Sequence, residues 1–293
     1  MKYGIVIPNF GKFADRESIL EISITAEELG FDSLWVSDHI VLPKEHNGFG
    51  NIFYEPLVTL SYIASQTKTI KLGTSVIVVP YRNPVVFAKS ISTLDVLSGG
   101  RVIIGIGAGW LKKEFQALGA NYEERGKITD EYLELMNELY TSESPTFNGN
   151  YFNISDISFN PKPLQKPHPP IWVGGSSKNA LKRAVKYGNG WHAVGYTPEE
   201  IKDKTEELKD IFAEYNKTDS NFIISVRRNL QITSREVSDE KETFRGNINK
   251  IKDGIDAYKN AGVSHIVFQI LSSDLKGVIE TMQRFSKKFN LSS

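Results

Sequence analysis

Residues 169–177 read Pro-Pro-Ile-Trp-Val-Gly-Gly-Ser-Ser, a short apolar run that leads directly into paired glycines and paired hydroxyls. The apolar run is typical of a strand buried on both faces, because it offers no polar side chain to water. The glycines can adopt backbone angles closed to other residues, and the serines add hydroxyls where the helix of residues 179–186 begins. The stretch predicts a strand-to-helix turn that is either an ordinary turn with a serine N-cap or a cradle for a phosphate group.

The same alternation of short apolar runs and longer amphipathic runs extends along the whole chain and gives eight strand-helix pairs. Strands this apolar, in fewer than 300 residues, favour a (β/α)₈ TIM barrel with loop insertions over an open doubly wound sheet. The first strand is also not followed by a Gly-x-Gly-x-x-Gly turn, so we expect one barrel domain over residues 1–293. The predicted strands are 3–7, 33–36, 70–76, 101–106, 171–173, 191–194, 222–232 and 265–269, and the helices are 18–29, 57–66, 85–97, 129–140, 180–186, 199–215, 247–261 and 275–289.

Composition narrows the class of function. The 35 basic and 35 acidic side chains cancel, so neither a nucleic-acid track nor a membrane-surface patch is indicated, and a small-molecule substrate is the better expectation. The chain has no cysteine, which excludes disulfides, thiolate nucleophiles and sulfur-ligated metals. Its five histidines show no metal-type spacing, so we expect no metal site. No apolar stretch is long enough to cross a membrane, and Pro8 interrupts the first apolar run, so we expect a cytoplasmic protein.

The carboxyl ends of the predicted strands carry the candidate site. In a barrel, the loops that follow strands build the active site, and the connections 42–55, 111–127 and 143–169 are unusually long. The second strand delivers Asp38 and His39, an acid and an imidazole that we predict to be catalytic. The alternative is structural, with the aspartate capping a turn and the histidine bonding a neighbouring carbonyl.

Two further strand ends are rich in small residues. The third predicted strand ends with Gly73-Thr74-Ser75-Val76, which leaves room for a planar ring. The fourth ends with a glycine run at 105–109, which indicates close approach of the backbone to a bulky group, and Trp110 beside it is either a lid or a plug. His192 lies inside an apolar strand, where a histidine is more often a satisfied core residue, so it is left unassigned.

Taken together, these residues resemble the bacterial-luciferase-like superfamily of flavin and deazaflavin oxidoreductases. The matching stretches run in family order from the first strand to the sixth, whereas the last quarter matches only loosely, through Ala261-Gly262-Val263. The matching stretches are 4–8, 26–35, 37–39, 72–76, 94–101, 107–110 with 114–115, 167–175 and 188–191.

The resemblance implies a barrel with a long insertion between late strands, usually dimeric, that holds an isoalloxazine or 5-deazaisoalloxazine ring across its strand ends. It implies a non-proline cis peptide at Ser75-Val76 against the ring, and a cofactor phosphate against the glycines of the fifth strand. His39 inherits the role of proton carrier or substrate orienter. The cofactor-binding residues implied are Thr74, Ser75, Val76, Gly107, Ala108, Gly109, Gly174, Gly175, Ser176 and Ser177.

The Ser-Asp-His and Gly-Ala-Gly-Trp sequences are more similar to the branch that uses coenzyme F420, which exchanges a hydride with an organic substrate. One alternative is an FMN-dependent monooxygenase served by a separate reductase, and another is a non-catalytic cofactor-binding barrel. Family members that oxidise a sugar phosphate carry an acid where this chain has Trp110, so that substrate is not expected. Glu114, one turn later, fits a loop anchor at least as well as a catalytic acid. Basic side chains for the polyglutamate tail of F420 are available in Lys44, Arg82, Lys178 and Arg183.

Overall fold

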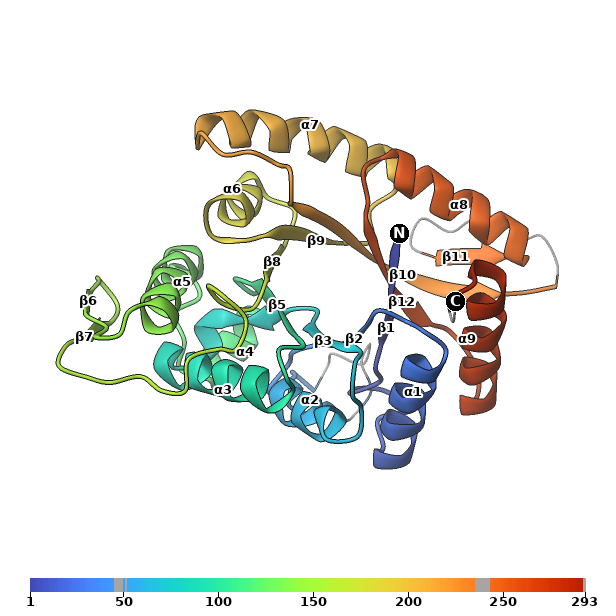
Figure 1. The fold of residues 1–293 in the computed structure, drawn as a ribbon, viewed down its shortest axis with the longest axis horizontal. Helices are drawn as coiled ribbons and strands as arrows, with labels where there is room; N and C mark the ends of the chain where they lie inside the picture. The colour runs from blue at the N-terminus through green and yellow to red at the C-terminus, as the bar shows by residue number, and fades with distance from the viewer. Residues whose placement is uncertain (45–49, 51, 235–242, 292–293) are drawn as a thin grey trace.

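Eight parallel strands close into a barrel in the computed structural model, which describes residues 1–44, 50, 52–234 and 243–291. The first and last barrel strands lie side by side, in blue and red in Figure 1, and β9 pairs with β10 to complete the ring. This confirms the predicted (β/α)₈ barrel. The barrel strands, in spatial order, are β1 (Lys2–Val6), β2 (Ser33–Val36), β3 (Lys71–Thr74), β5 (Val102–Gly107), β8 (Ile171–Gly174), β9 (Gly190–Val194), β10 (Ile223–Ile232) and β12 (His265–Ile270).

Helices surround the barrel and bury their apolar faces against the strands (Figure 1). Most begin at a side chain that accepts a backbone N–H of the first turn, as Asn83 does from Val85 and Val86. The helix after β9 has a full capping box between Thr197 and Glu200. The helices are α1 (Arg16–Glu28), α2 (Pro56–Ala64), α3 (Pro84–Leu97), α4 (Lys112–Ala117), α5 (Arg125–Thr141), α6 (Lys178–Tyr187), α7 (Pro198–Glu214), α8 (Ile248–Asn260) and α9 (Leu275–Phe289).

Short elements extend this frame at both ends. Beyond β3, strand β4 (Ile77–Val78) pairs with β5 and leads into the 3₁₀ turn η2 (Val79–Tyr81), and β11 (Thr243–Gly246) pairs with β10. The hairpin of β6 (Phe147–Asn148) and β7 (Asn153–Ile154) lies in the connection between α5 and β8.

The expectation that the long connection 143–169 belongs to the mouth of the barrel is wrong. Because it precedes a strand, it lies at the amino ends of the strands. There the side-chain amide of Gln165 donates to the carbonyl oxygen of Val102, the first residue of β5, and to Asp95.

The interior of the barrel is filled with side chains. Trp35 is fully buried and stacks on His192, with 5.0 Å between ring centroids, and on Trp172 at 5.1 Å. His192 is hydrogen-bonded at both ring nitrogens, to the hydroxyls of Ser75 and Ser225. Burial lowers the pKa of His192 to about 3, so this core histidine is neutral near pH 7. The barrel is therefore a packed core, and a ligand site must lie above it.

Membrane-spanning helices and metal-binding clusters are both absent from the described ranges. Across residues 1–44, 50, 52–234 and 243–291, no helix is both long enough and apolar enough to cross a membrane. In the same ranges, no three His, Cys, Asp or Glu side chains come together in a way that could hold a metal ion.

Closure of the barrel depends on a glycine at position 105. A Cβ atom there would lie 1.7 Å from the carbonyl oxygen of Thr74 on the neighbouring strand, so β3 and β5 could not keep their spacing. We expect Gly105→Ala to lower the free energy of unfolding by at least about 3 kcal/mol. Gly126→Ala is the matched control, because its Cβ would meet only Arg183 at 3.6 Å and alanine is the better helix former. Urea unfolding curves showing equal stability for both variants would contradict this account.

Candidate functional site

A cavity of about 650 Å³ opens at the carboxyl ends of the barrel strands. Ten of the twelve predicted site residues line it. Thr74 does not, because its buried hydroxyl donates to the carbonyl oxygen of Gly105 between two strands. Ser176 is exposed and lies outside the cavity wall. The predicted residues in the wall are Asp38, His39, Ser75, Val76, Gly107, Ala108, Gly109, Gly174, Gly175 and Ser177.

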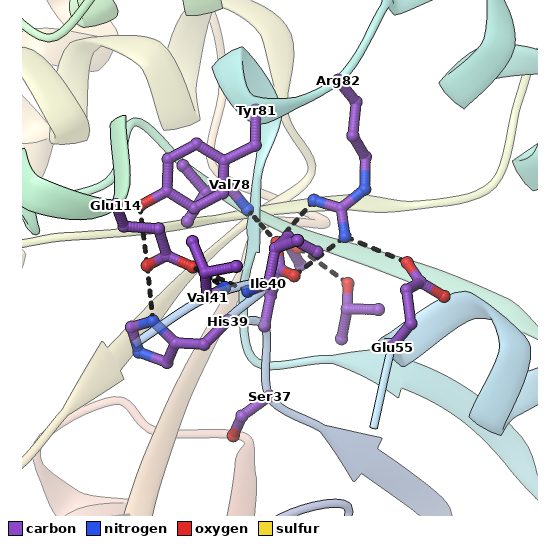
Figure 2. Close-up of polar contacts among 12 residues, drawn as sticks. Ser37, His39, Ile40, Val41, Glu55, Val78, Tyr81, Arg82 and Glu114 are labelled. Carbon is purple, nitrogen blue, oxygen red and sulfur yellow. Dashed lines mark hydrogen bonds and ion pairs between the residues drawn. The ribbon is translucent and has the colours of Figure 1, made fainter. Parts of the chain in front are cut away.

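His39 is held by a buried carboxylate. Its Nδ1 lies 2.7 Å from Oε2 of Glu114, a residue of α4 that is only 1% exposed (Figure 2). The same carboxylate accepts the backbone N–H groups of Ile40 and Val41 and the hydroxyl of Tyr81. One side chain thus joins the loop after β2 to the loop after β4 and fixes the imidazole between them.

The charge of Glu114 follows from these contacts. Burial alone would raise its pKa, but the hydrogen bonds from His39 and from the backbone N–H groups of Ile40 and Val41 outweigh burial and lower it. Burial and the nearby carboxylate raise the pKa of Tyr81, so its hydroxyl stays protonated and donates. An ionised carboxylate can only accept, so Nδ1 of His39 carries a proton and Nε2 is the nitrogen that can gain or lose one.

Asp38 was predicted to be catalytic, and its contacts fit the structural alternative. Its carboxylate has no solvent exposure and accepts two bonds from Arg82, at 2.7 and 2.8 Å, and one from the backbone N–H of Val78. The same guanidinium also reaches Glu55 (Figure 2). These contacts position the loops on either side of the mouth, and the geometry favours an anchor over a proton carrier. Arg82 was expected to be available for the polyglutamate tail of the cofactor. Its guanidinium is instead paired with Asp38 and Glu55.

Another wall of the cavity, after β3, β5 and β8, is built of backbone. The Ser75–Val76 peptide is cis, as the resemblance implied. Val76 covers two glycines: a Cβ atom at Gly107 would lie 3.0 Å from one of its methyl groups, and a Cβ at Gly174 would lie 3.1 Å from another. Gly175 has a φ of 108°, a conformation that other residues rarely adopt. Glycine at these positions thus lets the valine, and any group above it, approach the strand ends.

Cations flank the glycine wall. Ser177 caps α6 by accepting the N–H of Ala180, so the N-terminus of this ten-residue helix points its positive end at the cavity. Arg125 lies on the same side, with its Nε bonded to the carbonyl oxygen of Gly109. Arg183 lines the cavity too, but it is paired with Asp130 at 2.6 Å. This wall has the donors that a phosphate group requires.

Sequence reasoning missed several residues of the wall. Phe10 and Gln269 come from the ends of the first and last barrel strands, and Tyr81 comes from η2. Arg227 lies on β10 with its side chain in the cavity wall. The sequence did contain a signal for Arg227, because a charged residue within a predicted buried strand is unusual. Nothing in the local sequence showed where its side chain would point.

A closed (β/α)₈ barrel with a glycine-walled cavity at its strand ends is typical of enzymes that act on small molecules. The sequence profile of luciferase-like monooxygenases matches residues 1–274, and the chain belongs to this family. Similar proteins include an F420-dependent glucose-6-phosphate dehydrogenase of Amycolatopsis mediterranei (strain U-32), 34% identical over 61% of this chain and 54% of the relative. They also include an FMNH(2)-dependent dimethylsulfone monooxygenase of Pseudomonas putida, 30% identical over 55% of this chain and 46% of the relative.

The matched region thus spans about half the length of these two relatives. Among solved structures, an F420-dependent secondary alcohol dehydrogenase in complex with an F420-acetone adduct superimposes with a TM-score of 0.83, over 100% of this chain and 99% of that one. At 20% sequence identity, this likeness concerns the fold. Both F420-dependent and FMN-dependent oxidoreductases are therefore among the relatives of this chain.

The lowered pKa of Glu114 predicts a stability that depends on pH. The ionised form stabilises the fold above the ordinary pKa of 4.5, and this stabilisation is lost as the pH falls through the lowered folded-state value. We expect Glu114→Gln to cost about 2 kcal/mol near pH 7 and to flatten the acid branch of the stability profile. Urea titrations between about pH 3 and pH 7 measure both effects. Glu21→Gln, an exposed position on α1, is the control, and an unchanged slope in Glu114→Gln would refute the assignment.

Proposed function

We propose that the chain is an oxidoreductase that binds coenzyme F420 in the cavity and exchanges a hydride with a small organic substrate. The observation that carries the proposal is the division of the cavity into two walls. One wall has the glycines, the N-terminus of α6 and Arg125, and the other presents His39 on Glu114. The F420-dependent relative from Amycolatopsis supports the choice of cofactor.

The residues present fit such a cofactor. Its phosphate would be held by Ser177, by the first N–H groups of α6 and by Arg125. Its ring would lie against the Ser75–Val76 peptide, in the space that Gly107 and Gly174 keep open. When bound, a deazaflavin supplies a ring carbon that accepts or donates a hydride and activates dioxygen poorly.

The protein would supply a proton donor and acceptor and would limit the access of water to it. His39 takes up or releases a proton at Nε2 while Glu114 holds the opposite nitrogen protonated. The imidazole is 9% exposed and packs edge-on against Phe53 and Trp110, so bulk water has little access to it. Trp110 is itself 57% exposed, at the outer rim of the cavity. A substrate bound beside His39 would thus exchange its proton with one defined atom.

One observation favours the second candidate, an FMN-dependent monooxygenase. Beyond the glycine wall, Lys182 is paired with Glu214 at 2.6 Å and Lys186 with Glu134 at 3.2 Å. A cofactor that ends at its phosphate would leave these lysines to the protein's own carboxylates, whereas a polyglutamate tail would compete for them. The FMNH(2)-dependent relative from Pseudomonas putida agrees with this candidate, which would require a separate reductase.

Homodimer formation and cytoplasmic location stay predictions. The outer faces of α2 and α3 present large apolar side chains to solvent, with Val58 70% exposed, Val86 63% and Leu97 79%. These helices pack side by side, and a second copy of the chain would cover such exposed apolar side chains.

Parallel binding titrations with oxidised F420 and FMN test the proposal. We expect selective binding of F420, followed by its fluorescence, and loss of that binding in Gly174→Val, whose side chain would collide with Val76. Selective binding of FMN would support the monooxygenase. Binding of neither by the folded wild-type protein would overturn the glycine-wall assignment.

Replacement of His39 separates chemistry from binding. Because the imidazole follows β2, whereas the glycines follow β5 and β8, we expect His39→Ala to reduce turnover at least about 100-fold. We expect the dissociation constant of the cofactor to stay within about a factor of three. Rates at saturating cofactor, together with the titration above, measure the two effects separately. Equal losses in turnover and binding would remove the catalytic assignment.

A further inference from the structure

Arg227 spans the bottom of the cavity. It belongs to β10, which lies on the opposite side of the barrel from β3 in the strand order. Its Nη1 nevertheless reaches the Ser75 carbonyl oxygen at 3.2 Å, the Ser75 hydroxyl at 3.3 Å and the Ser37 hydroxyl at 2.9 Å. Its Nη2 donates to the side-chain oxygen of Gln269 at 2.7 Å. The guanidinium therefore lies across the barrel, on top of the packed core and under the open space.

All four of these acceptors are neutral. Within residues 1–44, 50, 52–234 and 243–291, no carboxylate lies within ion-pair distance of Arg227. The carboxylate that lines the cavity, Asp38, is bound on both oxygens by Arg82. The charge of Arg82 is thus balanced by a carboxylate, whereas the charge of Arg227 is not.

An unbalanced charge in this position is costly. Burial lowers the pKa of Arg227 to about 10, which still leaves it positive near pH 7. Neutral hydroxyl and amide groups satisfy its N–H groups but do not neutralise it, and a buried cation is stabilised by an anion. The remaining direction from which an anion can come is the cavity.

Resting on the proposed function, we propose that Arg227 binds the anionic edge of the reduced cofactor ring, the N1–C2 carbonyl segment, and so favours the reduced over the oxidised form. Position supports the ring over a substrate group. The guanidinium contacts Ser75, the first residue of the cis peptide against which the ring would lie. It also lies at the depth of the core, since the same Ser75 hydroxyl bonds His192.

The electron balance explains why the reduced form is the one recognised. With the ring hydroxyl of the deazaflavin protonated, the oxidised ring is neutral, as it is in FMN. Adding two electrons and one proton, equivalent to a hydride from the donor substrate, leaves one negative charge shared by N1 and the C2 oxygen. No covalent bond to the protein forms. A fixed cation at that edge stabilises the product of the reduction and not its reactant, which raises the reduction potential of the bound cofactor.

Dissociation constants for the oxidised and the dithionite-reduced cofactor test the inference in the whole protein, with F420 and FMN in turn. We expect Arg227→Gln to weaken the reduced form about tenfold more than the oxidised form, a fall of about 30 mV for a two-electron couple. The pH at which the bound reduced ring ionises should rise, as followed by its absorbance. Arg227→Lys, which keeps the charge, should restore most of the preference.

Arg125→Gln is the matched control. This cation lies at the phosphate end, and the phosphate does not change on reduction, so both redox forms should weaken equally. Equal weakening of both forms in Arg227→Gln, with an unchanged melting temperature, would overturn the inference. A loss confined to binding of a carboxylate-bearing substrate would overturn it too and assign Arg227 to that substrate. If the wild-type protein binds neither cofactor, the proposed function fails and this inference with it.

Discussion

The site depends on the way the barrel interior is filled. Trp35, fully buried inside the eight-stranded barrel, packs against the rings of both His192 and Trp172. Its indole Nε1 donates to the Ser33 hydroxyl, so the ring is fixed in orientation as well as position. A side chain at the paired position of the neighbouring strand β3 would strike it, since a Cβ atom at Gly73 would lie 2.5 Å from the indole. Because this core is filled by side chains, the candidate site lies above it, and the uppermost polar atoms of the core become the bottom of the cavity.

Two buried carboxylates then order the loops above the core. Glu114 and Asp38 each hold segments that have no regular secondary structure of their own, the first around His39 and the second around Arg82. A buried charge is tolerated only when donors surround it, so the structure that satisfies each carboxylate is also the structure that positions the site. Loops fixed in this way can present an imidazole with a defined proton while remaining at the surface.

The local pattern of the sequence predicted the fold well, because strand and helix periodicity and apolar strand ends are local properties. All eight strand-helix pairs appear, and the glycine wall lies where its strand ends indicated. Local pattern could not predict contacts between residues far apart in the sequence. Glu114 is hydrogen-bonded to His39, 75 residues away, and Arg227 to Ser75, 152 residues away. Arg82 is a further example, because it pairs with Asp38. Its position in the sequence showed only that a basic side chain was present there. The cis peptide was predicted from family resemblance and not from any property of the two residues.

The distribution of charge bears on the choice between the two candidate cofactors. Of the arginines that line the cavity, Arg125 lies beside the glycines and Arg227 lies on the core. A phosphate at one end and a redox ring at the other would satisfy both, and F420 and FMN share these two groups. In the proposed function, the cavity itself would thus accept either cofactor. The two cofactors differ beyond the phosphate, where Lys182 and Lys186 already pair with carboxylates. Under the proposed function, selectivity between them would depend on that outer surface, and substitutions there would change it without altering the chemistry at His39.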